Sequence, residues 1–105
     1  MRTHIAVAVK DIEESVGEYT RLLGQGPDLV VPGSYALWRT PALNLSIRKT
    51  GEGAGTVRHV GFEKDEAERF TEYRDCNGLL WETFNKDHQA EEINTFWKSA
   101  DYKPR

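Results

Sequence analysis

Two short segments, residues 3–9 and 57–63, alternate in side-chain type with a period of two, and each carries a histidine. Such alternation predicts β-strands with two different faces. In the first segment His4 lies on the same face as two small alanines. In the second, His59 lies on the face opposite to that of the bulky side chains. Residues 50–56, between the two strands, contain three glycines and no large apolar residue. We therefore interpret this segment as the boundary between two halves of the chain.

The first half, residues 1–50, continues as a helix followed by three strands. Asp11 has the spacing of a capping residue, and the apolar stripe behind it predicts a helix over residues 11–23 that ends at Gly24. Turn-forming residues separate three further β-prone runs. These runs are residues 29–31, 35–40 and 43–48. The predicted order of the first half is β-α-β-β-β.

The second half, residues 57–84, is too short for a strand, a full helix and three more strands. Residues 65–70 allow barely two turns of helix, which would need packing to be stable. The pair Asn77-Gly78 predicts a hairpin between the last two strands. We expect this half to lack most of its helix and one or two strands. A final helix is predicted within residues 87–98, followed by a frayed tail.

The composition favours one folded domain over residues 1–105. Of these residues 38% are apolar and 30% are charged, which is ordinary for a globular protein. A net charge of -3 lacks the basic surface that binds phosphate backbones, so nucleic acid is not an expected partner. The longest apolar stretch, residues 5–9, is too short to span a bilayer, and no signal pattern is present. We expect a soluble, cytoplasmic protein.

His4, His59 and Glu82 form the histidine and carboxylate set that the pattern places on comparable elements, the opening strand of each half and the final strand. Two neutral imidazoles and one carboxylate bind a divalent ion and leave positions free for substrate, which suits Fe, Mn, Ni or Zn. Cys76, as the single cysteine, can supply neither an intrachain disulfide nor a multi-thiolate site. From the pattern alone, hydrogen-bonded or solvated side chains are the commoner explanation of the same three residues.

Three separated segments, in the same order, resemble a known superfamily. Residues 4–24, which begin HIAVAVKDIEESV, resemble the opening module of the vicinal oxygen chelate superfamily, which includes glyoxalase I, extradiol dioxygenases, and fosfomycin- and bleomycin-resistance proteins. Residues 58–62 (RHVGF) are similar to the opening of its second module, and residues 75–82 (DCNGLLWE) to its closing strand. Residues 35–47 are similar to the middle strands of the arsenic-lyase and cadmium-induced branch.

The resemblance implies an α+β fold in which paired βαβββ modules build a cupped, mixed sheet, here with an abbreviated second module. It implies that the metal ligands are His4, His59 and Glu82, which match the ligand positions of the superfamily. Asn44 stands where glyoxalase I has a fourth, glutamate ligand, and the adjacent cysteines of the arsenic-lyase branch are absent because Cys76 is alone. Both of those chemistries are therefore disfavoured.

Side chains on the middle strands are candidates for substrate binding. Asn44, Ser46 and Arg48 share the polar face of one strand, and Arg48 can clamp a carboxylate or a phosphonate. Trp38 and Tyr35 can stack on a flat or apolar substrate. The alternatives are a solvated face for the three polar residues and core packing for the two aromatic ones. No residue is singled out as catalytic.

Two functions are compatible with these residues and with the resemblance. In the first, the protein is a small metal-dependent enzyme, a lyase or dioxygenase of the vicinal oxygen chelate type, whose divalent ion acts as a Lewis acid on a small oxygen-bearing substrate. In the second, it is a metal-free module, like bleomycin-resistance proteins, that binds a small molecule between two protomers. The short second half leaves an open sheet edge, which predicts a homodimer whose first modules complete each other's cup.

Overall fold

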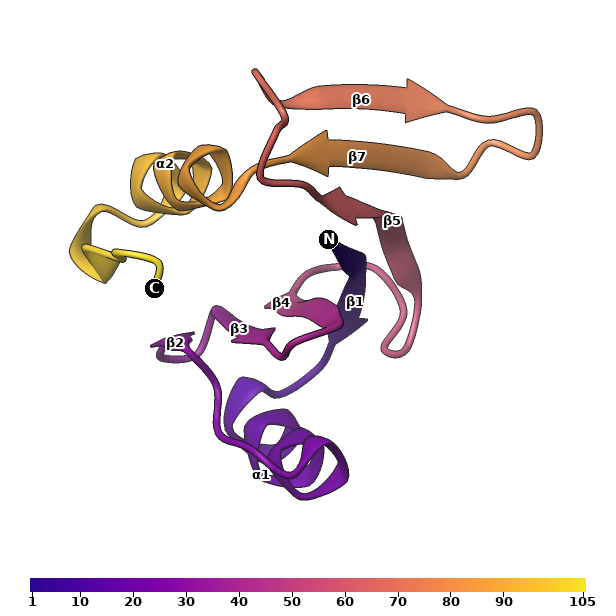
Figure 1. Ribbon diagram of the computed structural model, residues 1–105. Coiled ribbons are helices and arrows are strands. Elements are labelled where there is room, and N and C mark those ends of the chain that lie inside the picture. The colour runs from indigo at the N-terminus through magenta and orange to yellow at the C-terminus, as the bar shows by residue number, and fades with distance from the viewer.

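Seven strands form a single mixed sheet in the computed structural model, which describes all 105 residues (Figure 1). The strands are β1 (Arg2–Val9), β2 (Leu29–Val31), β3 (Tyr35–Arg39), β4 (Leu43–Lys49), β5 (Val57–Glu63), β6 (Thr71–Arg74) and β7 (Leu80–Phe84). The helices are α1 (Ile12–Leu23), α2 (Lys86–Phe96) and the short 3-10 helix η1 (Lys98–Ala100). This architecture confirms the expected α+β fold with a mixed sheet.

The strand order is β2-β3-β4-β1-β5-β7-β6, so the two halves of the chain meet where β1 pairs antiparallel with β5. The sheet curls in this region, and Figure 1 shows β6 and β7 lying across from β3 and β4, with α2 at the open side. The inner face of the curl is the face that α2 approaches, and α1 lies on the outer face (Figure 1). None of the helices is long and apolar enough to cross a membrane.

Helix α1 begins where the sequence predicts a cap. The side chain of Asp11 accepts a hydrogen bond of 2.8 Å from the backbone N–H of Glu14, and Gly24 ends the helix in the left-handed conformation. The apolar stripe of α1 packs on the outer face of β1, β3 and β4. The buried residues of this cluster are Val9, Ile12, Ala36, Trp38 and Ile47.

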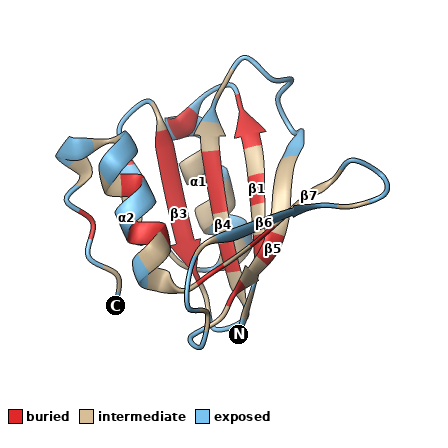
Figure 2. Cartoon of the chain, turned by 90° about the horizontal axis from the view of Figure 1, so that it is seen from above, coloured by how far each residue is buried: buried red, intermediate tan, exposed pale blue.

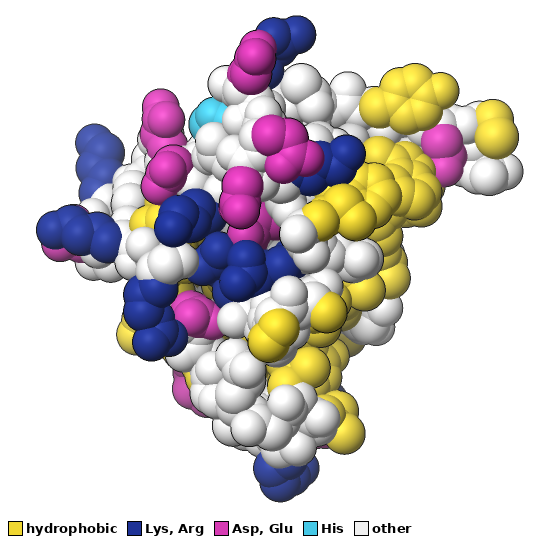
Figure 3. Space-filling view, in the orientation of Figure 1, with side chains coloured by type: hydrophobic (Ala, Val, Ile, Leu, Met, Phe, Trp, Pro, Cys, Tyr) yellow, Lys and Arg dark blue, Asp and Glu magenta, His cyan; other side chains and the backbone are white.

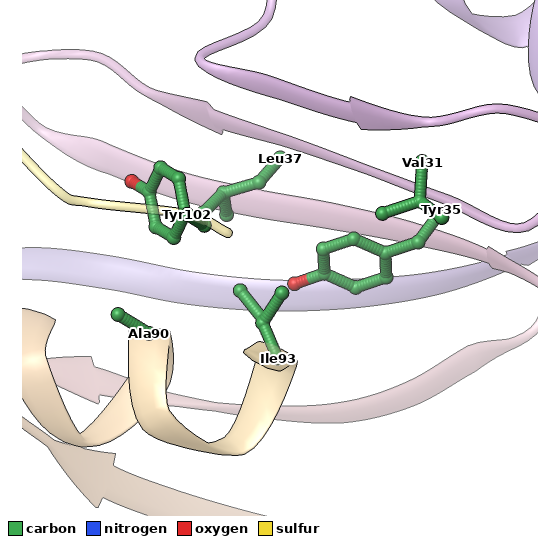
Figure 4. Packing of buried hydrophobic residues seen from close by; sticks show 6 residues of the cluster. All are labelled: Val31, Tyr35, Leu37, Ala90, Ile93 and Tyr102. Atoms are coloured by element: carbon green, nitrogen blue, oxygen red, sulfur yellow. The ribbon is translucent and has the colours of Figure 1, made fainter. Parts of the chain in front are cut away.

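A second buried cluster lies between α2 and the inner face of β2 and β3. Its residues are Val31, Tyr35, Leu37, Ala90, Ile93 and Tyr102 (Figure 4). Because α1 covers one face of β3 and α2 the other, this strand is buried along its whole length (Figure 2). The two clusters therefore fix which side chains of β3 point toward the inner face.

The C-terminal tail is anchored, so the expectation of frayed residues at 99–105 is wrong. The backbone N–H of Tyr102 donates a 2.7 Å hydrogen bond to Asn94, and the Tyr102 ring is buried against α2 and β3. The guanidinium of Arg105 lies 3.0 Å from the carboxylate of Asp28, and the backbone carbonyl of Arg105 accepts a hydrogen bond from Arg39. The polar, charged tail is held by contacts to distant residues, which local sequence patterns do not reveal.

The second half, residues 57–84, contains three strands and no helix. Residues 65–70, where a helix start is expected from the sequence, form a short turn and irregular backbone instead. The segment has to connect β5 to β6 within a few residues, and the amide of Asn85 donates to the carbonyl of Ala67 to hold it. As a result, no helix covers the outer face of β5 and β7. Phe62 and Trp81 stack there, and Figure 3 shows hydrophobic side chains gathered on this side.

Candidate metal centre

The strand register brings His4, His59 and Glu82 to one place on the inner face of the sheet. His4 of β1 pairs with Gly61 of β5, and Gly61 pairs in turn with Glu82 of β7. His59 lies two residues before Gly61 and pairs with Ala6. Residues in lateral register point to the same face of a sheet, so these side chains converge.

The distances between the three side chains suit ligands of a single ion. The Nε2 atoms of His4 and His59 lie 3.0 Å apart, and the Nε2 of His59 lies 3.1 Å from Oε1 of Glu82. The Nε2 of His4 lies 4.0 Å from the same oxygen. Donors bound at right angles to a first-row divalent ion are about 3 Å apart. One donor atom from each of the three residues lies within 4.8 Å of the others, which is close enough for one metal ion.

Gly61 allows β5 and β7 to approach closely beside the candidate ligands. It occupies the sheet row between His4 and Glu82. A Cβ atom at this position would overlap the backbone carbonyl oxygen of Glu82. The close approach of β7 to β5 therefore requires glycine here.

Hydrogen bonds fix the orientation and the tautomer of His4. Its Nδ1 lies 2.8 Å from the side-chain oxygen of Asn44 and 3.1 Å from the Asn44 backbone oxygen. Both partners are acceptors only, so Nδ1 carries the proton and Nε2 presents a lone pair toward His59. Burial, followed by the charge of His59, lowers the pKa of His4 and favours the neutral imidazole that a metal ion binds.

The amide of Asn44 is in turn oriented by Glu63. The Asn44 Nδ2 donates a hydrogen bond of 2.9 Å to Glu63 and one of 2.8 Å to Gln89. The side-chain oxygen of Asn44 therefore has to face His4. Glu63 is 1% exposed and receives two hydrogen bonds from Arg39, of 2.9 and 2.8 Å, and one of 2.7 Å from Arg2. An acceptor-only carboxylate thus sets the donor and acceptor ends of the amide, and the amide sets the tautomer of the histidine.

The candidate ligands line a small pocket with a volume of about 60 Å³. Its walls come from both halves of the chain and from α2. The aromatic and apolar walls are Tyr35, Phe70, Phe84, Ile93, Phe96 and Trp97, and the polar ones besides the ligands are Ser46, Arg48, Arg58, Gln89 and Glu92. A small molecule bound here would contact both apolar and charged side chains.

The predicted substrate-binding residues lie in three different environments. Ser46 and Arg48 line the pocket. Asn44 is fully buried behind His4 and supports the ligand instead of lining the pocket. Trp38 lies on the outer face, packed against α1, and its Nε1 donates to the carbonyl of Gln25. The placement of Trp38 corrects the expectation that it stacks on substrate, because the alternation of β3 sends Tyr35 and not Trp38 toward the pocket.

Sequence reasoning missed the contribution of α2 and of the buried carboxylate. Gln89, Glu92 and Trp97 reach the pocket because α2 and the residue after it fold back from β7 onto β3. The helical spacing of Ala90, Ile93 and Trp97 indicates an apolar stripe but not which strand it covers. The alternation in β5 places Glu63 on the same face as His59, but the acidic residues that follow it give the segment the pattern of a solvated edge. The sequence does not show that Glu63 is buried and bound by Arg39 and Arg2.

Replacing Asn44 by leucine is expected to weaken metal binding by about 10- to 100-fold, because His4 would lose the acceptor that fixes its tautomer and ring orientation. Competition with a chelator of known affinity measures the change. Asn77→Ala, in the exposed β6–β7 turn, serves as a control that should keep the affinity of the unaltered protein. Equal affinities for the two variants would contradict the positioning role of Asn44.

Similarity to known proteins covers only part of the chain. Over 68 residues the chain is 35% identical to a trivalent organoarsenical cleaving enzyme of Thermomonospora curvata. The match covers 63% of this chain and 45% of that enzyme, so the chain spans less than half of the length of this relative. No family model matches the chain.

A solved structure, described as an NAD-dependent benzaldehyde dehydrogenase from Legionella pneumophila, has a similar fold. The TM-score is 0.53 over 80% of this chain and 99% of that chain, with 13% sequence identity. At this identity the likeness concerns the fold alone. The fold and the three converging side chains define a small α+β protein with a candidate site for one metal ion.

Proposed function

We propose that the protein is a small metal-dependent enzyme of the vicinal oxygen chelate type, with His4, His59 and Glu82 as the metal ligands. The observation that carries this proposal is the convergence of the three donor atoms within 4.8 Å from strands that are distant in the sequence. The tautomer of His4 supports it, because the Nε2 lone pair is directed at the centre of the set. Similarity to an enzyme that cleaves organoarsenicals supports an enzymatic role.

A divalent ion at these ligands would supply a Lewis acid that binds and polarises substrate oxygens. The residues that line the pocket would determine which substrate binds with its oxygens at the ion. Phe84 and Ile93 shield one side of the pocket from water, and Ser46 offers a hydroxyl beside the ligands. All three ligands come from one chain, so this site does not need residues of a second copy. The expected homodimer stays a prediction, which light scattering at micromolar concentration tests.

The substrate we propose bears oxygen donors and is not a trivalent arsenical. Trivalent arsenic is a soft centre that prefers thiolate ligands. The pocket contains no cysteine, and Cys76 is exposed in the turn between β6 and β7. The activity of the relative from Thermomonospora curvata is therefore not proposed for this chain.

Metal analysis of protein purified without a tag tests the proposal. We expect one divalent ion per chain in the unaltered protein and its loss in the variants His59→Ala and Glu82→Ala. His88→Ala is the matched control, because His88 lies at the start of α2 and caps that helix through Asn85. A His59→Ala variant that keeps the metal content of the control would refute the ligand assignment.

One observation favours a metal-free binding module as the second candidate. His59 and Glu82 lie 3.1 Å apart, so a protonated imidazole could satisfy the carboxylate without an ion. In that case the protein would bind a small molecule in the pocket and would have no catalytic activity. Protein that stays metal-free after equilibration with Fe²⁺, Mn²⁺, Ni²⁺ and Zn²⁺ would favour this candidate over the enzyme.

A further inference from the structure

The pocket holds a cation that has no hydrogen-bond or ion-pair partner in the protein. Arg48 lines the pocket from β4, and its guanidinium makes no hydrogen bond to the protein and no ion pair within 4.0 Å. The other arginine of the pocket, Arg58, is paired with Glu52 at 3.1 Å. Glu82 and Glu92 also line the pocket, but neither forms an ion pair with Arg48. An unpaired guanidinium beside a candidate metal centre is a ready site for an anion.

Two aromatic rings hold this guanidinium in place. Its central carbon lies 4.0 Å from the centre of the Phe96 ring and 5.2 Å from that of Trp97. Contact with aromatic faces attracts the cation and leaves the N–H groups at the edge of its plane free. Burial, and then the charge of Arg58, lower the pKa of Arg48, so the charge is partly stripped of water and gains from an anion. The fork of donors is thus ordered before any ligand arrives.

The spacing along β4 sets the length of the ligand. Asn44 pairs with His4, and Arg48 follows four residues later on the same face, opposite Ala8. Four residues of strand extend about 13 Å, and the long side chain of Arg48 can bridge part of this distance. Ser46 lies between these two positions on the same face and also lines the pocket. A ligand that contacts both ends needs several bonds between its two polar groups.

We propose that Arg48 binds the carboxylate of a small aromatic acid whose other end points toward His4, His59 and Glu82. The flat apolar body would lie against the walls formed by Phe84, Ile93 and Trp97. This inference rests on the proposed function for the end at the metal. The carboxylate subsite itself is formed by Arg48 and its aromatic neighbours and does not require an ion.

Titrations with phenylacetate and its neutral amide, phenylacetamide, test the subsite, with calorimetry or amide chemical shifts as the readout. We expect the protein to bind the acid at least about 10-fold more tightly than the amide, as for a charge-assisted, bidentate contact. Arg48→Met, which keeps the apolar stem, should abolish this preference, and Arg48→Lys should retain part of it. Lys49→Met, at an exposed neighbouring position of β4, is the control and should keep the preference.

Equal affinities for acid and amide, or an Arg48→Met variant that keeps the preference, would overturn the inference. Tighter, Arg48-dependent binding of phenylphosphonate than of phenylacetate would overturn the carboxylate assignment. Repeating the titrations with and without Zn²⁺ separates this inference from the proposed function. A carboxylate preference in protein that binds no Zn²⁺ would support the subsite and refute the metal centre, whereas Zn²⁺ binding without that preference would do the reverse.

Discussion

Replacing Gly61 by alanine is expected to destabilise the protein by more than about 3 kcal/mol, above the usual range for overpacking, and to abolish metal binding. The added methyl group would overlap the carbonyl oxygen of Glu82, which belongs to the sheet backbone and cannot rotate away. Separating β7 from β5 would relieve the overlap but would withdraw Glu82 from His4 and His59. Urea denaturation measures the first effect, and metal content measures the second.

Gly17→Ala provides the matched control for this substitution. Gly17 lies within α1, and a Cβ atom there would meet nothing within 4 Å. Because glycine is a poor residue for the middle of a helix, alanine at this position should stabilise the protein by about 0.5 to 1 kcal/mol. If Gly61→Ala were as stable as Gly17→Ala and still bound metal, the close packing of β5 against β7 would be wrong.

Replacing Glu63 by glutamine is expected to lower the free energy of unfolding by about 3 to 5 kcal/mol, because it leaves the buried guanidinium of Arg39 without its counter-charge. Glutamine also introduces donors toward Arg39, Arg2 and Asn44, all of which donate to the native carboxylate. Chemical denaturation at neutral pH measures the loss. Glu52→Gln, which removes the exposed pair with Arg58, should cost at most about 1 kcal/mol.

The contribution of Glu63 also depends on pH. Burial alone would raise its pKa, but the hydrogen bonds from Arg39 and Asn44 and the charges of the two arginines prevail and lower the pKa from 4.5 to about 2. A carboxylate with a depressed pKa stabilises the folded state above its ordinary pKa and loses that effect as the pH falls toward the depressed value. The stability difference between the native protein and Glu63→Gln should therefore shrink between about pH 5 and pH 2. A constant difference across this range would contradict the assignment.

The sequence was sufficient to predict the elements whose signals are local. The alternation around His4 predicted β1, and the cap at Asp11 predicted α1. Both signals, a strand with two unlike faces and a capped amphipathic helix, depend only on residues that are close together in the sequence. The three candidate ligands were also predicted together, since each stands on a strand and the resemblance aligned the strands. Their mutual distances depend on the register around Gly61, which no local pattern specifies.

Features that depend on contacts between distant segments were not predictable in the same way. Both faces of β3 are buried, so its sequence lacks the polar and apolar alternation that would have shown on which face Trp38 lies. Residues 65–70 have the composition of a helix start, but the short connection to β6 overrides that preference. The sequence likewise does not show that Arg48 lacks an ion pair, because this depends on where the acidic side chains of distant segments lie.

Helix α2 supplies much of the pocket wall but none of the three candidate metal ligands. The ligands belong to β1, β5 and β7, whereas Ile93, Phe96 and Trp97 belong to the segment that follows them. Much of the pocket wall and the candidate ligands are consequently encoded in separate stretches of the chain. Substitutions at Ile93, Phe96 or Trp97 would change the shape of the pocket without altering His4, His59 or Glu82, whereas Gln89 of the same helix hydrogen-bonds Asn44 behind His4.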